Sequence, residues 1–473
     1  MFETGIRQLR LALSMVRGRQ MSPRNVERLV DDALQTLATF GTPGDDVDQL
    51  LDGPFADQDV RREFQNRALR RTARRLAARS PYYRRLFEVH SVDVRHLGID
   101  DMAAIPTTTK ADLIEHQRQF VTEGSTPFVT SRTTGTTGQP AEVWLSRYEL
   151  ELWPAIGALS GLLRGEIGPD DCMQINISSR ATAAVQMNLA VCRLVRARSR
   201  VLGVLAPDES LDSLLDGGER APTLLNTYPS YLAQLVGAAR RRGLGSDHFK
   251  LRRITCGGEV LSTTLAGAAE ATFGASVVDS FGMTEILPVS GRVCDHRHLH
   301  HDLNMGFVEV IDLRSGSPAA PGQLGTVVVT PYYPYRECMP VFRYDTRDVV
   351  RRLAEEPLGC ELAGVPATSL ILGKADHLLR AETGVMTMRD LVEVIESQPG
   401  QPWPARFAAT VRDGRVRLRL ADFPGPFGPG DLQHRFSAAG FDVEVSAAVG
   451  VPPHSLRPLR ADLVETTFSG ARS

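Results

Sequence analysis

Apolar positions recur every three or four residues through much of the first 90 residues. VERLVDDALQTLATF (26–40) and ALRRTARRLAARS (68–80) carry leucine and alanine at this spacing, which predicts amphipathic helices. GTPGDD (41–46) separates them, because glycine, proline and aspartate favour turns. We expect residues 1–90 to form a helical segment of a larger domain. It is either a packed helical cap or a basic face for a membrane surface, and we favour the cap.

Between residues 100 and 350, helical stretches alternate with short β-rich runs. SRVLGVLAP (199–207), ASVVDSFG (275–282) and GTVVVTPYY (325–333) are examples, and the alternation predicts α/β layering. In IDLRSGSPAAPGQLGTVVVT (311–330), two predicted strands flank a turn region rich in glycine, proline and serine.

The pattern changes after Gly373. RFAATVRDGRVRLRLADF (406–423) predicts a hairpin that turns at Asp413-Gly414, and GDLQHRFSAAGFDVEVSA (430–447) predicts a helix followed by a strand. We therefore expect an α/β fold, with a large multi-layer N-terminal domain of β-sheets flanked by helices and a small α+β C-terminal lid domain. The expected boundaries are 1–90 for the helical segment, 91–373 for the large domain and 374–473 for the small domain.

Composition is consistent with this organisation and excludes several classes of protein. A chain of 473 residues exceeds one ordinary core, and a net charge of −2 without single-sign blocks does not indicate a nucleic-acid partner. No apolar run approaches the ~20 residues of a membrane span. Arginines interrupt the N-terminus where a signal peptide would be apolar, and six scattered cysteines do not form a disulfide pattern. We expect a cytoplasmic protein without a membrane partner and make no prediction of oligomeric state.

TTGTTGQP (133–140), which follows the predicted strand VTEGSTPFVT (121–130), suits an anion-binding loop. Glycines let the backbone turn tightly so that N–H groups can converge on an anion, and threonine hydroxyls add donors. The run does not match the phosphate-binding pattern GxxxxGK[ST]. Taken alone, it is equally consistent with an ordinary surface turn.

Four further stretches place polar residues at turns. ITCGGEVLS (254–262) and VVDSFGMTEI (277–286) are predicted strands that end in glycine turns. FRYDTRDVVRR (342–352) is expected to place Asp345 and Asp348 on a turn before a strand, and ILGKADHLL (371–379) lies at the domain boundary. Ligands of open α/β sheets bind outside the carboxyl ends of the strands, so these turns are expected to border one site.

In this order, together with SPYYRRLF (80–87) and IPTTTKADL (105–113), the motifs resemble the adenylate-forming superfamily of acyl-CoA synthetases, adenylation domains and luciferases. The phenylacetate–CoA ligase-like branch is the most similar. The resemblance implies that ATP and Mg²⁺ are the cofactors. It implies a loop over the ATP β- and γ-phosphates made of Thr133, Thr134, Gly135, Thr136, Thr137 and Gly138. It also implies an adenine site bordered by Gly257, Gly258, Glu259, Asp279, Ser280 and Phe281, the last standing where the family usually has tyrosine.

The same resemblance implies roles for the remaining polar residues of these motifs. Thr284 would contact the α-phosphate and Glu285 would bind Mg²⁺. Asp348 would bind the ribose hydroxyls, assisted by Lys374 in place of the usual arginine, and Asp376 would be the hinge.

The acid pocket has a weaker signature. TYPSYL (227–232) lies where the family lines this pocket, so Tyr228 and Ser230 are candidates, although Tyr228 can equally be a core aromatic residue. The segment QINISSRATAAVQMN (174–188) departs from the glycine- and aromatic-rich stretch of the branch, which would fit an unusual substrate.

The C-terminus departs further, because the family usually carries a lysine there that bridges the carboxylate and the α-phosphate. The matching stretch is VPPHSLRPLR (451–460), and no lysine follows Lys374. Arg457 or Arg460 is a candidate replacement, but arginine and lysine are not interchangeable. Three consequences of the absent lysine are open: adenylation is slow, an arginine takes the place of the lysine, or the acyl chemistry has been replaced by another reaction.

VCDHRHLHHD (293–302) concentrates one cysteine and four histidines. The resemblance implies a structural zinc here, with Cys294, His300 and the later Cys360 matching three ligand positions, while Leu362 replaces a second late cysteine. His296, His298 or His301 can complete a tetrahedral set.

The resulting hypothesis is an ATP-dependent, AMP-forming ligase. It would activate a carboxylic acid, which we expect to be aromatic, as acyl-AMP and transfer it to CoA or an amine. One alternative is a diazotase that activates nitrite for transfer to an aryl amine, and a second is an inactive nucleotide-binding protein.

Overall fold

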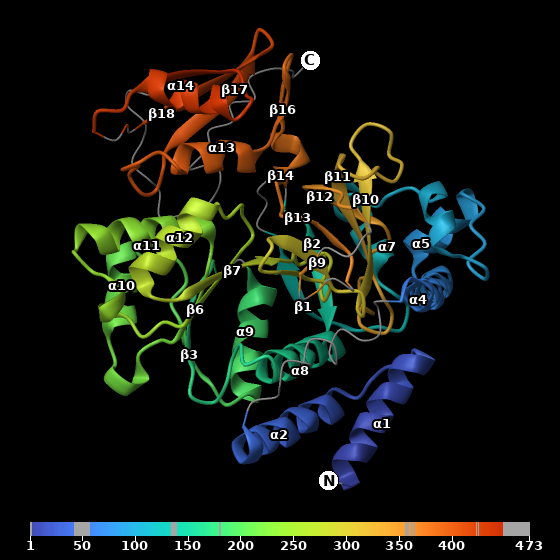
Figure 1. Cartoon of the computed structure of the whole chain (residues 1–473). Helices are drawn as coiled ribbons and strands as arrows, with labels where there is room; N and C mark the ends of the chain where they lie inside the picture. The colour runs from blue at the N-terminus through green and yellow to red at the C-terminus, as the bar shows by residue number, and fades with distance from the viewer. Residues whose placement is uncertain are drawn as a thin grey trace. The chain divides into compact units, whose positions relative to one another are not determined.

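The structure is a computed structural model that describes residues 2–41, 57–133, 140–178, 181–354, 359–360, 362, 365–421, 423 and 425–447 (Figure 1). The chain divides into two compact units. The first unit comprises Met1–Asp171, Ser179–Ser199 and Phe281–Leu370, and the second comprises Cys172–Ser178, Arg200–Ser280 and Ile371–Ser473.

Both units contain helices and strands, but the alternation expected up to residue 350 ends early, because the described residues of 276–374 form strands joined by turns without an α-helix. The helices of the first unit are α1 (Phe2–Arg17), α2 (Pro23–Phe40), α4 (Gln58–Arg79), α5 (Pro81–Val89), α6 (Lys110–Glu115), α7 (Gln117–Phe120), α8 (Arg147–Leu163) and α9 (Thr182–Leu194). Its strands are β1 (Pro127–Arg132), β2 (Glu142–Ser146), β8 (Gly291–Val293), β9 (His298–His301), β10 (Gly306–Asp312), β11 (Leu324–Pro331), β12 (Tyr344–Arg351) and β13 (Ala367–Ser369). The helices of the second unit are α10 (Pro207–Leu215), α11 (Pro229–Arg241), α12 (Thr263–Phe273), α13 (Met388–Glu396) and α14 (Pro429–Ala438). The remaining strands are β3 (Cys172–Asn176), β4 (Arg198–Val201), β5 (Leu224–Thr227), β6 (Arg253–Gly257), β7 (Ser276–Phe281), β14 (Gly373–Lys374), β15 (Leu379–Ala381), β16 (Gly384–Met386), β17 (Phe407–Arg412), β18 (Arg415–Leu420) and β19 (Val443–Ala447).

The helices predicted near the N-terminus are present as α2 and α4. α2 contacts α8, and its apolar stripe is buried as the helical spacing requires. α4 starts where the Asp57 side chain accepts the N–H groups of Asp59 and Val60, which satisfies donors that have no partner inside the helix. No described helix is long and apolar enough to cross a membrane.

An antiparallel sheet of β10, β11 and β12 forms part of the first unit. β10 and β11 pair from Gly306↔Pro331 to Asp312↔Gly325, which confirms the two strands predicted around the glycine- and proline-rich turn. The valines of β11 are fully buried, and the Asp312 carboxylate caps the turn.

Two sequence predictions in the first unit were wrong. The strand predicted over 121–130 begins only at Pro127, because Thr122 and Glu123 direct their N–H groups to the carbonyls of Cys338 and Arg79. The second concerns Asp345 and Asp348, which were expected on a turn and lie instead on β12. The register of β12 against β11 shifts beside these residues, and Arg347 between them has φ 60°. The residues that were predicted to form a turn therefore form a β-bulge inside the strand.

A buried charge network fixes the start of α8. The Glu149 carboxylate accepts the N–H groups of Ser146 at 2.6 Å, Glu337 at 2.8 Å and Cys338 at 3.1 Å. Arg336 Nε lies 3.6 Å from the same carboxylate, and both side chains are 0% exposed. Glu149 therefore supplies the counter-charge of a buried guanidinium and holds a loop against the helix.

In the second unit, the parallel strands β3, β5, β6 and β7 pair in the spatial order β7-β6-β5-β3. α10, α11 and α12 pack with them around one core, which includes Leu225, Tyr231, Ile254 and Phe273. Since the strands are parallel, their carboxyl ends meet at one edge, which is where the GGE and DSF segments lie.

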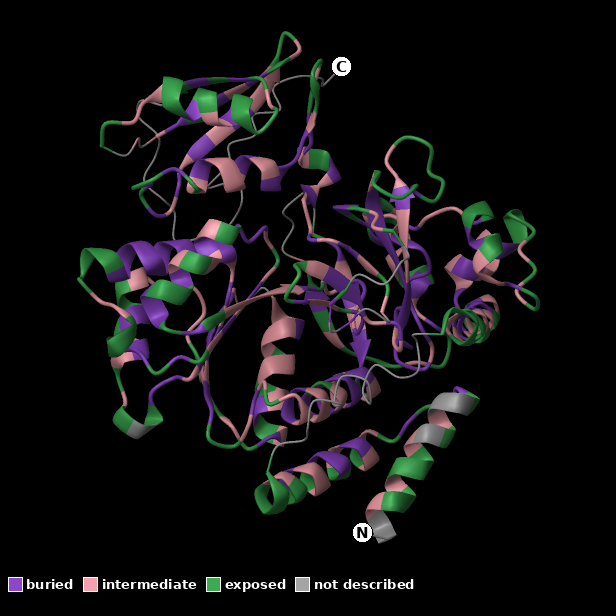
Figure 2. Ribbon diagram, viewed as in Figure 1, coloured by how far each residue is buried: buried purple, intermediate pink, exposed green. Residues whose placement is uncertain are grey.

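The described residues of 406–447 confirm the predicted hairpin, helix and strand. β17 and β18 pair up to Arg412↔Arg415, and Asp413 and Gly414 adopt φ 51° and 71° at the turn. β19 adds in parallel to β18. Buried residues of these strands, α13 and α14 form one core, visible in purple in Figure 2. The α/β fold class is confirmed, and the boundary at residue 373 stays a prediction.

α13 contacts the N-terminal end of α12 within this unit. Glu393 accepts the N–H of Thr263 at 3.0 Å, and the Ser262 hydroxyl donates to Glu396. Carboxylates are stabilised at a helix N-terminus by the unpaired N–H groups and the helix dipole. Burial nevertheless raises the pKa of Glu396 from its usual 4.5 to about 7, and the charge of Glu393 adds to the rise.

We predict that Glu149→Ala lowers the free energy of unfolding by about 3–5 kcal/mol, because Arg336 would be left buried without its counter-charge. The measurement is urea unfolding followed by circular dichroism. Glu151→Ala on the same helix is the control: Glu151 pairs with Arg147 at the surface, so its loss should cost less than about 0.5 kcal/mol. Equal losses for the two variants would contradict this account.

A second prediction concerns pH. Since the folded state holds the Glu396 proton more tightly than the unfolded state, the stabilisation is complete below about pH 4.5 and declines until about pH 7. Glu396→Gln should remove this contribution to the pH dependence of the free energy of unfolding. The difference in free energy of unfolding between the wild type and the variant should change by less than about 3 kcal/mol between pH 4.5 and pH 7. The measurement is urea unfolding at several pH values. A pH-independent difference would refute the assignment.

Candidate functional site

The predicted phosphate loop connects β1 and β2, which pair in register from Val129↔Leu145 to Arg132↔Glu142. At the base of the loop, Thr133 N–H donates to the carbonyl of Ala141 at 2.9 Å, and Ala141 N–H donates to the Thr133 hydroxyl at 3.0 Å. The hairpin therefore closes at Thr133. Thr134, Gly135, Thr136, Thr137 and Gly138 lie outside the described residues.

The second unit gathers the predicted adenine and acid residues at the carboxyl ends of its parallel strands. A Cβ placed on Gly257 would lie 2.9 Å from the carbonyl oxygen of Ser280, so only glycine fits there. Gly258 has φ 83°, and a Cβ placed there would lie 3.5 Å from the ring of Tyr228. The sequence prediction therefore grouped residues that do lie close together, although the members of each pair are 23 and 30 positions apart in the sequence.

Tyr228 and Ser230 are held by groups from this same cluster. The Tyr228 hydroxyl accepts the N–H of Ser178 at 3.2 Å, and burial raises the pKa of the phenol. Glu259 accepts the N–H of Ser230 in the first turn of α11 at 2.8 Å. Tyr228 is half-buried beside Gly258, so it joins the cluster at the strand ends.

The first unit contributes a group of carboxylates. Glu285 is 4% exposed and Asp348 is 7% exposed, and both lie near the phenol of Tyr344. Burial raises the pKa of Tyr344 well above its usual value, and the negative charges of Glu285, Asp345 and Asp348 add to the rise. Thr284 precedes Glu285 in a turn and is half-buried. This group offers oxygen ligands suited to a hard cation and acceptors suited to hydroxyls.

The remaining predicted nucleotide and hinge residues are distributed along the chain. Phe281 is 8% exposed and meets the ring of His301 edge-on at 5.8 Å. Lys374 ends β14, and Asp376 follows in a 3₁₀ turn. Arg457 and Arg460 lie outside the described residues.

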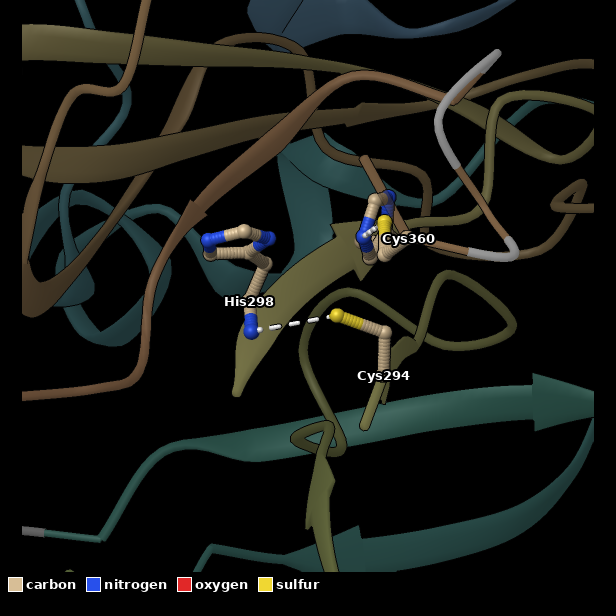
Figure 3. Close-up of side chains that lie close together, drawn as sticks. Cys294, His298 and Cys360 are labelled. Atoms are coloured by element: carbon tan, nitrogen blue, oxygen red, sulfur yellow. Dashed lines mark hydrogen bonds between the residues drawn. The ribbon is translucent and has the colours of Figure 1, made fainter. Parts of the chain in front are cut away.

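Cys294, His298, His300 and Cys360 form a cluster in the first unit, and their ligand atoms all lie within 4.8 Å of one another (Figure 3). The three residues predicted for zinc are therefore together, and His298 is the fourth. His300 Nδ1 faces the carbonyl of Val365 at 2.8 Å. If Nδ1 carries the proton, as that contact requires, Nε2 presents a lone pair, and it lies 3.4 Å from Cys360 Sγ inside the cluster.

The other two histidines considered for the fourth position are placed differently. His301 Nε2 faces the Thr368 hydroxyl at 3.1 Å, and burial lowers the pKa of His301 to about 4. His296 is exposed and stacks on the ring of His298. The Nδ1 atom of His298 is buried without a hydrogen-bond partner, which is consistent with a metal-binding side chain.

Leu362 is the residue that the sequence resemblance places at the position of a second late cysteine. It is 5% exposed and packs with Cys294 and Cys360. Two sulfur and two imidazole ligands match the donor set that Zn²⁺ prefers, so the residues present fit this metal.

Comparison with known proteins identifies similar enzymes. A model of the family described as AMP-binding enzyme matches residues 86–331, more than half of the chain. A phenylacetate-coenzyme A ligase of Thermus thermophilus is 25% identical over 324 residues, which cover 67% of this chain and 71% of the relative. A phenylacetate-coenzyme A ligase of Escherichia coli is 27% identical over 357 residues, covering 72% and 76%.

Solved structures share the fold. A 2-hydroxyisobutyryl-CoA ligase in the postadenylation state with 2-HIB-AMP aligns with a TM-score of 0.73 at 20% identity, covering 87% of this chain and 90% of the other. An ATP-bound MatB from Rhodopseudomonas palustris aligns with a TM-score of 0.52 at 18% identity, covering 69% and 65%.

Proposed function

The chain belongs to the AMP-binding enzymes, in the phenylacetate–CoA ligase-like branch of the adenylate-forming superfamily, and is an AMP-forming ligase; from this we propose that it uses ATP to convert an aromatic carboxylic acid to acyl-AMP. Coenzyme A is the proposed acceptor, in line with relatives named phenylacetate-coenzyme A ligase. An amine is the other acceptor that the sequence allows.

One observation carries the proposal: Glu285 and Asp348, 4% and 7% exposed, lie near one phenol on a chain whose family binds AMP. Attack of a carboxylate on the α-phosphorus needs in-line positioning and neutralisation of charge. Asp348 would accept the ribose hydroxyls and Thr284 would donate to the α-phosphate. Mg²⁺ bound at Glu285 would neutralise phosphate charge.

The acid would bind in the second unit beside Tyr228 and Ser230. A Cβ placed on Gly258 would lie 3.5 Å from the Tyr228 ring, and burial raises the pKa of this phenol further above neutral pH. A neutral phenol can donate to a carboxylate or pack against an aromatic ring. These properties support an aromatic acid as the substrate class.

The test is ATP–pyrophosphate exchange over a panel of aryl acids, with thioester formation measured by adding coenzyme A. Asp348→Asn should raise the KM for ATP by about tenfold or more, because a charged acceptor for hydroxyl groups is lost. It should also reduce the preference for ATP over 2′-deoxy-ATP.

Asp312→Asn is the control, since Asp312 lies in the same sheet but its carboxylate caps an exposed turn. Its KM for ATP should stay within about twofold of wild type, as for most substitutions outside a site. Absence of exchange with every acid would count against acyl activation. Tight ATP binding without turnover would favour the inactive nucleotide-binding protein instead.

A second candidate function is that of a diazotase, which would activate nitrite with ATP and transfer it to an aryl amine. The observation in its favour is that VPPHSLRPLR (451–460), the stretch that the resemblance matches to the bridging lysine, contains arginines and no lysine. Nitrite-dependent AMP release in the presence of an aryl amine, with none from carboxylic acids, would select this function. AMP release with acids alone would reject it.

A structural zinc held by Cys294, His298, His300 and Cys360 is also part of the proposal. It would join the β8–β9 region to residues around Cys360, which lie more than 50 positions further along the chain. Its chemistry would be structural, because four protein ligands leave no open position for a water molecule.

We predict about one zinc per chain in the wild type, as four protein ligands define one site. Cys294→Ser and His298→Ala should each lower the zinc content measured by elemental analysis and reduce the melting temperature. His296→Ala is the control, because its exposed ring stacks on His298 without joining the cluster. Full zinc retention by His298→Ala would show that His298 is not a ligand.

A further inference from the structure

Arg389 on α13 connects several segments of the second unit through one guanidinium group. Its Nη1 donates to the carbonyl of Leu261 at 2.8 Å and its Nε to the carbonyl of Ile371 at 2.9 Å. It also pairs with Glu393 at 3.2 Å and with Asp279 at 3.6 Å. Leu261 follows the GGE turn, Asp279 lies near the end of β7, and Ile371 precedes the predicted hinge.

The burial of this arginine indicates more than a stabilising role. Its side chain is only 9% exposed, and removing a guanidinium from water costs several kcal/mol that its partners must offset. Apolar residues of similar size often stabilise such a position as well as an ion pair does. Unlike an apolar residue, arginine can fix the orientation of its partners, because its planar guanidinium group donates to carbonyls and carboxylates at defined angles.

The two carboxylates that pair with Arg389, those of Glu393 and Asp279, differ in their other contacts and in their exposure to solvent. Glu393 lies one turn after Arg389 on α13, and its carboxylate also accepts the N–H and hydroxyl of Thr263 at the start of α12. It therefore docks α13 on α12. The carboxylate of Asp279 is 19% exposed, so it is more open to solvent than the guanidinium that it faces.

Asp279 is opposite Cys256 in the pairing of β7 with β6, next to the close approach of Gly257 and Ser280. These are the residues expected to border the adenine. A carboxylate accepts hydrogen bonds only. It therefore suits the 6-amino group of adenine, which donates, and disfavours the 6-oxo group of hypoxanthine, which accepts.

We propose that Arg389 is a positioning residue that holds the Asp279 carboxylate toward the adenine edge of the nucleotide. The docking of α13 on α12 then contributes to nucleotide affinity and to the choice of base, although no atom of Arg389 needs to touch the nucleotide. This inference rests on the proposed function, because it assigns a role at the same nucleotide site.

The test compares ATP with inosine triphosphate on the full chain. Arg389→Met should weaken ATP binding, measured by calorimetry, by about tenfold and inosine triphosphate binding by less than about threefold, because only adenine loses a donor–acceptor contact. The KM for ATP in AMP formation should rise in parallel, with a smaller change in kcat. Arg389→Lys should recover part of the affinity.

Asp279→Asn should reproduce the loss, and combining it with Arg389→Met should add little, because both changes act through one carboxylate. Arg417→Met is the control. Arg417 forms a solvent-exposed ion pair with Glu444 on the neighbouring strand of the same unit, so this variant should bind both nucleotides as the wild type does.

The outcomes separate this inference from the proposed function. If the wild type binds ATP and Arg389→Met binds it equally well, the inference fails while the proposed function stands. Equal weakening of both nucleotides, or additive losses with Asp279→Asn, would show a merely structural role and also overturn it. If the wild type binds neither nucleotide, the proposed function fails and the inference fails with it. Should Arg389→Met not fold, as judged by circular dichroism, the comparison is decided by Arg389→Lys with Asp279→Asn.

Discussion

The carbonyl oxygen of Ser280 leaves no room for a side chain at position 257, since a Cβ there would lie 2.9 Å away. With glycine, the ends of β6 and β7 approach closely, and the chain can turn through Gly258 at φ 83°. Glu259 then reaches the first turn of α11. The arrangement of acceptors and donors at this edge of the sheet depends on that close approach of two backbones.

Arginine supplies the positive charge of the buried ion pairs described here. Lysine occurs only at positions 110, 250 and 374, and the three buried ion pairs described here use guanidinium groups. Arg343 forms a two-pronged pair with Glu309, with nitrogen–oxygen distances of 3.0 and 3.1 Å. Arg336 also donates to a backbone carbonyl, as does Arg389. A guanidinium has five donors in a fixed plane, so it can satisfy a carboxylate and the backbone together where an ammonium could satisfy fewer.

The sequence predicted most reliably what local patterns determine. Alternating residues around Asp413-Gly414 predicted the C-terminal hairpin, and glycine-containing turns after apolar runs predicted the ends of β6 and β7. The bulge at Arg347 was not predicted, because a non-glycine residue with φ 60° carries no sequence signal of its own. Arg389 was missed because its partner Asp279 lies 110 positions earlier and no spacing rule connects the two. The first sign of such a residue is a charged position on an otherwise apolar helix face.

The choice of His298 in the cysteine and histidine cluster could not be made from spacing either, because three histidines besides His300 lie within seven positions of Cys294 along the chain. Charge explains why an imidazole suits the position. Zn²⁺ with two thiolates and two neutral imidazoles carries no net charge, whereas a third thiolate would leave one negative charge to bury. Cys294, His300, Cys360 and Leu362 are all less than a tenth exposed, and burying an uncompensated charge is costly. With Leu362 in place of a thiolate, two imidazole ligands therefore keep the proposed zinc site neutral in its apolar surrounding.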